Sequence, residues 1–169
     1  SSVLDLRQFL NSSPTPFHAV QSIKRQLIDK DFRELRESQL WETMRGGKYY
    51  VTRGETSIVA WVQGESFPDH GAHIIGAHTD SPNLRLKPHP NINRNGYRQL
   101  GVEVYGGVLL GTWTDRDLSL AGRVFVESAN GLKTYSLLCG QPLIRIPQLA
   151  IHLNREVNEK GLQLNRQKH

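Results

Sequence analysis

Along the first thirty residues, hydrophobic side chains recur every three or four positions, which is the spacing of one face of an α-helix. The first helix is predicted from Leu6, Phe9 and Leu10. A second helix is expected to begin at Thr15 and Pro16, because threonine caps helix N-termini and proline is pre-shaped for the first helical position. The buried stripe of this second helix consists of Val20, Ile23 and Leu27.

After Gly46 and Gly47 the hydrophobic period changes to two, which is typical of β-strands. The alternating residues predict a hairpin around Gly54 and are Tyr49, Val51, Ile58, Ala60 and Val62. Residues 72–77 form a short, mostly apolar run that ends at His78, and such a run favours a strand buried on both faces. Residues 82–96 are rich in Pro, Asn and Arg, so we expect a loop or a crossing between domains there.

Beyond this stretch, short strand-like runs dominate, and they predict a second, β-rich unit. These runs are residues 101–105, 123–126, 134–138 and 143–146. The fold class expected is therefore α/β, a mixed sheet flanked by helices followed by a β-rich part, with domains at residues 1–90 and 91–169. The polar tail after residue 161 follows the last recognisable element, residues 151–157, and we expect more polypeptide to follow it in the parent protein.

Composition and charge narrow the classes of protein further. With 37% hydrophobic residues among 169, the chain is long and apolar enough for a packed core. The single cysteine, Cys139, makes no internal disulfide, and neither a membrane-span-length apolar run nor a signal segment is present. These features predict a soluble protein of a reducing compartment, hence a cytoplasmic protein with no membrane partner.

The net charge of +5 raises the question of an anionic partner. Nucleic-acid grooves interleave basic with aromatic side chains, whereas the basic residues here are scattered. The densest basic stretch, residues 85–98, is broken by Pro88, Pro90 and Gly96, which favours a solvated loop. We therefore expect no nucleic-acid partner.

The sharpest local signal is His78, followed by Thr79 and Asp80. A histidine at the carboxyl end of a strand lies where open α/β sheets place their ligand crevices, and its imidazole can bind a divalent metal ion. A turn at Ser81 and Pro82 would let the Asp80 carboxylate hold the other imidazole nitrogen, which fixes the tautomer and raises the basicity of the ligand. Taken alone, a His-x-Asp sequence favours a capped turn with an exposed histidine over a metal ligand.

Five blocks in order resemble the aspartyl aminopeptidase family of zinc metallopeptidases, and they span nearly the whole chain. The blocks are SPTPFHA at 13–19, GAHTDSP at 76–82, GVEVYGG at 101–107, TDRDLSLAGR at 114–123 and RIPQLAIHL at 145–153. The resemblance implies the amino-terminal portion of a homo-oligomeric enzyme with a two-metal site, usually filled with zinc. Its implied substrate is a peptide with an acidic first residue, Asp or Glu. Residues 91–169 would then be part of an oligomerisation domain inserted into the catalytic domain.

By the same resemblance, His78 is a metal ligand and Asp80 is the catalytic-site residue that supports it. His152 is implied either as a metal ligand or as a substrate contact from a neighbouring subunit. We predict that it serves a different active site from the one that holds its own chain's His78. The alternative is a buried histidine bonded to backbone within its own domain.

The bridging carboxylate and glutamate base that a two-metal hydrolase needs are absent from the family motifs in this chain. Several acidic residues are candidates by type, but they lie outside the ligand motifs and are Glu103, Asp115, Asp117, Glu127, Glu156 and Glu159. Structural or exposed roles are predicted for the remaining histidines, which include His18, His70, His73 and His89. The chain alone is therefore predicted to be inactive. The rival interpretation is a non-catalytic, β-rich assembly or binding module.

Overall fold

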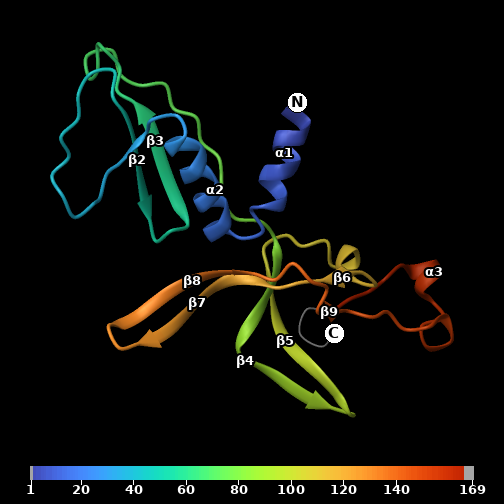
Figure 1. Cartoon of the computed structure of the whole chain (residues 1–169). Coiled ribbons are helices and arrows are strands. Elements are labelled where there is room, and N and C mark those ends of the chain that lie inside the picture. Colours follow the sequence, from blue (N-terminus) through green and yellow to red (C-terminus); the bar gives the residue numbers. More distant parts are fainter. Residues whose placement is uncertain (1, 166–169) are drawn as a thin grey trace. The chain divides into compact units, whose positions relative to one another are not determined.

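The computed structural model of the chain describes residues 2–165, and their contacts divide it into two units (Figure 1). The first unit consists of Ser1–Asp80 and Ala121–Leu138, and the second of Ser81–Leu120 and Cys139–His169. The division at residue 90 into a catalytic and an inserted domain stays a prediction. No helix among the described residues combines the length and the hydrophobicity that a membrane span requires.

Two helices open the first unit, α1 (Ser2–Asn11) and α2 (Pro16–Ile28). As predicted, α2 is capped by Thr15, whose Oγ1 accepts a hydrogen bond from the backbone N–H of His18, and Pro16 occupies the first helical turn. The buried side of α2 includes Val20, which is 1% exposed. Helix α2 contacts two strands of the same unit, β3 and β7.

A mixed three-stranded sheet follows, which confirms the predicted α/β class. Its strands are β1 (Arg33–Glu34), β2 (Lys48–Arg53) and β3 (Ser57–Val62), with β1 parallel and β3 antiparallel to β2. The predicted hairpin turns at Gly54 and Glu55, both with a φ of 59°. Glycine adopts this left-handed region freely, whereas Glu55 pays a steric penalty there.

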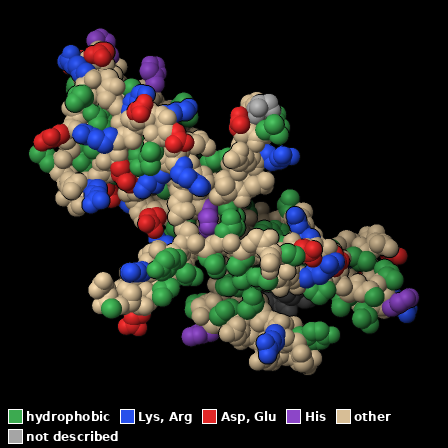
Figure 2. Space-filling view, viewed as in Figure 1, with side chains coloured by type: hydrophobic (Ala, Val, Ile, Leu, Met, Phe, Trp, Pro, Cys, Tyr) green, Lys and Arg blue, Asp and Glu red, His purple; other side chains and the backbone are tan. Residues whose placement is uncertain are grey.

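The first unit also contains the hairpin of β7 (Ala121–Ser128) and β8 (Gly131–Leu138). Every residue of β8 is exposed, as are three consecutive hydrophobic residues of β7, Val124, Phe125 and Val126. Hydrophobic side chains accordingly form part of the molecular surface in Figure 2.

The second unit begins with a long antiparallel ribbon of β4 (Asn83–Arg94) and β5 (Tyr97–Tyr105). The prediction of a loop at residues 82–96 is therefore wrong. The register shifts between Leu86 and Asn91, so Pro88 and Pro90 lie in a bulge, where strands tolerate residues without an N–H donor. Gly101 faces this bulge, because a Cβ added to it would lie 3.3 Å from Cδ1 of Ile92 and 3.6 Å from the carbonyl oxygen of Pro90.

Short elements complete the second unit. Strands β6 (Asp117–Leu118) and β9 (Ile144–Arg145) pair antiparallel. The remaining elements are the 3-10 helices η1 (Leu110–Trp113) and η2 (Ile151–Leu153) and the one-turn helix α3 (Val157–Lys160).

Residues 72–77 do not form the predicted strand. Ile74 and Ile75 are 89% and 99% exposed, and no backbone ladder joins this segment to another described residue. The hydrophobic pattern is that of a strand with neighbours on both sides, and the described part of the chain supplies neither neighbour.

Candidate metal-ligand site at His78

His78 and Asp80 lie together, as the sequence predicts. Nδ1 of His78 is 2.7 Å from the backbone carbonyl oxygen of Asp80 and 3.2 Å from its carboxylate Oδ1. Both partners are acceptors, so the arrangement favours the tautomer in which Nδ1 carries the proton. Nε2 then presents its lone pair, which is the form in which imidazole binds a metal ion.

The imidazole is open to solvent. The side chain of His78 is 80% exposed, and no described residue forms a hydrogen bond with its Nε2. One nitrogen is therefore held by the protein while the other is accessible. This arrangement is the one expected for a single histidine ligand of a metal site.

Between these two residues, Thr79 attaches the segment to the first unit's sheet. Its hydroxyl donates a 2.6 Å hydrogen bond to the carbonyl oxygen of Thr56, in the β2–β3 turn. Thr79 and Thr56 are both partly buried. Sequence reasoning missed this contact, because a threonine–carbonyl bond across 23 residues leaves no local pattern.

His152 lies in the second unit, as the middle residue of η2, and is exposed. Among residues 2–165, no group of three or more His, Cys, Asp or Glu side chains is arranged to hold a metal ion. The described residues therefore bring together His78 and Asp80 but do not assemble a complete centre. The assignments of His78 and His152 as metal ligands and of Asp80 as the residue that supports His78 stay predictions.

Three of the acidic candidates, Glu103, Asp115 and Asp117, form local ion pairs. Arg145 lies 4.0 Å from the Asp115 carboxylate and 3.6 Å from that of Asp117, and Asp115 Oδ1 also accepts from the backbone N–H of Gln148 at 3.1 Å. Glu103 forms an ion pair with Lys87 at 3.1 Å. These contacts account for the three carboxylates without a metal ion.

Of the other histidines, His18 has a structural role. It is 7% exposed, and its Nδ1 lies 2.7 Å from Thr15 Oγ1. Burial lowers the pKa of this imidazole, because desolvation penalises the charged form. His70, His73 and His89 are exposed, as predicted.

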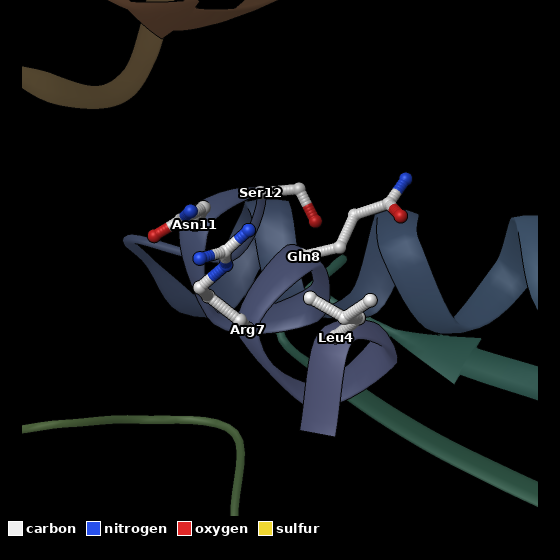
Figure 3. A pocket seen from close by; sticks show the side chains of 5 residues that line it. All are labelled: Leu4, Arg7, Gln8, Asn11 and Ser12. Atoms are coloured by element: carbon white, nitrogen blue, oxygen red, sulfur yellow. The ribbon is translucent and has the colours of Figure 1, made fainter. Parts of the chain in front are cut away.

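Two surface depressions are alternative candidate sites. Figure 3 shows one, lined by α1 and the residue after it, namely Leu4, Arg7, Gln8, Asn11 and Ser12. It offers a single charged side chain and no cluster of titratable groups. The other lies beside β3, with Trp41, Trp61 and Phe67 among its lining residues. Neither depression is lined by His78.

Comparison with known proteins places the chain in a family. The profile described as "Aminopeptidase I zinc metalloprotease (M18)" matches residues 9–169. The chain belongs to the M18 family. This confirms the resemblance to a family of zinc metallopeptidases seen in the five sequence blocks.

A relative named "Probable M18 family aminopeptidase 2", from Azotobacter vinelandii, is 50% identical over 163 residues. The match covers 96% of this chain and 38% of the relative. The chain thus spans less than two fifths of the length of the curated M18 relatives that it matches.

Two solved structures confirm the fold. In the cryo-EM structure of the Ape4 and Nbr1 complex, the matching chain has a TM-score of 0.92 and 44% identity, covering 98% of this chain and 32% of that one. A chain of the S. cerevisiae mApe1 dodecamer has a TM-score of 0.78 and 31% identity, and the match covers 86% of this chain and 35% of that one.

Proposed function

We propose that this chain is the amino-terminal portion of a metal-dependent aminopeptidase that removes Asp or Glu from the amino terminus of peptides. Membership of the M18 family supports the reaction class. The observation that carries the proposal is the state of His78, with Nδ1 held by Asp80 and Nε2 free for a ligand. The preference for acidic residues rests on the resemblance to aspartyl aminopeptidases alone.

In this proposal, His78 is one ligand of a zinc site and Asp80 is its positioning residue. The chemistry that bound zinc supplies is polarisation of the scissile carbonyl and activation of water. The carbonyl and carboxylate of Asp80 orient the ring, so the ligand needs no rearrangement to bind. His152 serves the site as a second ligand or as a substrate contact, from a neighbouring subunit of a homo-oligomer.

The proposal includes the predicted division of the chain into two domains with different roles. Residues 1–90 belong to the catalytic domain and residues 91–169 to an inserted oligomerisation domain of a cytoplasmic enzyme. A solved relative, mApe1 of S. cerevisiae, is a dodecamer, which supports a homo-oligomer. Because the described residues hold no complete metal centre, the 169-residue chain by itself is inactive in this proposal. Loss of general base catalysis alone costs about 10² to 10⁴ in rate.

The absence of a complete metal centre among the described residues also favours a second candidate. This is a non-catalytic assembly or binding module derived from such a peptidase. It predicts that the protein, at the length its source produces, neither binds zinc nor releases amino-terminal residues.

The test uses the protein at its native length. Release of the first residue is measured for peptides that begin with Asp, Glu or Leu, before and after chelation and after zinc is restored. We expect Asp and Glu to be released faster than Leu, and this release to be lost on chelation. His78→Ala is expected to abolish it. His73→Ala, an exposed histidine five positions earlier, serves as the matched control and retains activity. Full activity of His78→Ala would contradict the assignment, and equal release of Leu would contradict the acidic preference.

A further inference from the structure

The position of His78 depends on a turn far from it in sequence. Residues 63–82 contain no helix or strand, so His78 follows an irregular segment. The residue after it, Thr79, donates its hydroxyl proton to the carbonyl oxygen of Thr56 at 2.6 Å. This bond fixes the backbone immediately next to the imidazole to the β2–β3 turn.

The β2–β3 turn is itself fixed by a side chain from another strand, β7. The Nη1 group of Arg123, in β7, lies 3.3 Å from the carbonyl oxygen of Gly54 and 3.2 Å from the Glu55 carboxylate. Glu55 has a φ of 59°, a conformation that an L-residue keeps only when its surroundings impose it. Arg123 therefore clamps the two residues that precede Thr56.

Aromatic packing keeps Arg123 in place. Its guanidinium carbon lies 4.2 Å from the ring centre of Phe17, in the first turn of α2, and 5.0 Å from that of Phe125. The side chain is only 26% exposed. A guanidinium that stacks on two rings while it bonds a turn has little rotamer freedom left, so its hold on the turn is rigid.

We propose that Thr79 and Arg123 are positioning residues for His78. Arg123 fixes the β2–β3 turn, and Thr79 transmits that fixed position to the imidazole and to the Asp80 acceptors. The inference rests on the proposed role of His78 as a metal ligand. Partners outside the ligand shell influence metal affinity in this way, and their loss typically costs about 10- to 100-fold.

The first experiment measures zinc affinity and zinc bound per chain, by competition with a chromophoric chelator, on the protein at its native length. Thr79→Val keeps the shape of the side chain but removes the donor, and it is expected to weaken zinc binding by about 10- to 100-fold. Thr79→Ser keeps the hydroxyl and restores affinity. The matched control is Thr112→Val, which removes an equally short threonine bond, 2.7 Å, to the carbonyl of Leu109.

The second experiment tests the route from Arg123. Arg123→Met is expected to weaken zinc binding in the parent protein. In the Thr79→Val background it should cause little further loss of zinc affinity, because the link between His78 and the turn is already broken. Arg123→Lys retains the charge opposite Glu55 and stands in if Arg123→Met does not fold. Unfolding midpoints of all variants separate loss of position from loss of fold.

Outcomes for the inference and for the proposed function are distinguishable. If His78→Ala leaves zinc affinity unchanged, the ligand assignment itself is wrong. If His78→Ala abolishes zinc binding but Thr79→Val has the same zinc affinity as Thr112→Val, only the positioning inference is overturned. Equal losses of zinc affinity in Thr79→Val and Thr79→Ser would also overturn the positioning inference. If the losses of affinity from Arg123→Met and Thr79→Val are fully additive, Arg123 does not act on His78 through Thr79.

Discussion

Replacement of Thr15 by alanine tests how the start of α2 is stabilised. The Thr15 hydroxyl has two partners from one residue, since Oγ1 lies 3.4 Å from the backbone nitrogen of His18 and 2.7 Å from its Nδ1. His18 is 7% exposed, so water does not readily replace the hydroxyl. Thr15→Ala therefore removes a helix cap and leaves a buried ring nitrogen without its partner.

The expected loss follows from these two contributions. Loss of an N-cap side chain costs about 1 kcal/mol, and a buried polar group left unpaired costs about 1–3 kcal/mol. Thr15→Ala should thus lower the free energy of unfolding by about 2–4 kcal/mol. Thr15→Ser keeps both hydrogen bonds and is the matched control. It is expected to stay within about 0.5 kcal/mol of the parent.

The assay is urea unfolding followed by tryptophan fluorescence, in a double-mutant cycle with His18→Leu. In the His18→Leu background no ring nitrogen remains to be orphaned, so Thr15→Ala should cost only about 1 kcal/mol. An equal cost of Thr15→Ala in both backgrounds would refute the coupling between Thr15 and His18. A cost below about 0.5 kcal/mol in the parent would refute the cap itself.

Three further predictions concern the other histidines and their partners. Burial lowers the pKa of His18, so between this lowered pKa and the ordinary value of 6.5 the unfolded state binds more protons than the folded state. The free energy of unfolding should therefore decrease as the pH is lowered through this window, by at most about 1.4 kcal/mol per pH unit, and level off below it. His18→Leu should reduce this slope in urea titrations. Asp80→Asn should weaken zinc binding by only about tenfold, because the 2.7 Å bond to the backbone carbonyl still holds the ring, and Asp69→Asn should change nothing. Inactive His78→Ala and His152→Ala variants should regain part of their activity when co-assembled. If mixed oligomers form and no activity returns, His152 acts within its own chain's site or not at all.

Local rules predicted the parts of the fold that local chemistry decides. The Thr15 cap and the hairpin turn at Gly54 each depend on residues within four positions, and both were found where expected. The pairing of His78 with Asp80 is equally local, because a bend at Thr79 brings their side chains together.

What the sequence did not reveal depends on distant neighbours. Proline-rich composition predicted a loop at residues 82–96, but β5 pairs with both ends of β4 and leaves the prolines in the bulge. Residues 72–77 carry the pattern of an interior strand, yet a strand forms only where other strands complete its ladder. The bond from Thr79 to Thr56 likewise depends on a tertiary approach that no spacing encodes.

The bulge in β4 also bears on how the ribbon behaves in a crowded solution. Pro88 and Pro90 lie two residues apart, so along an extended strand their nitrogens face the same edge, and neither carries a hydrogen. A strand from another molecule that approached this edge would find two consecutive donors missing. Such gaps are among the means by which proteins prevent edge-to-edge aggregation. The prolines that obscured β4 in the sequence therefore remove two backbone donors from one edge of this strand.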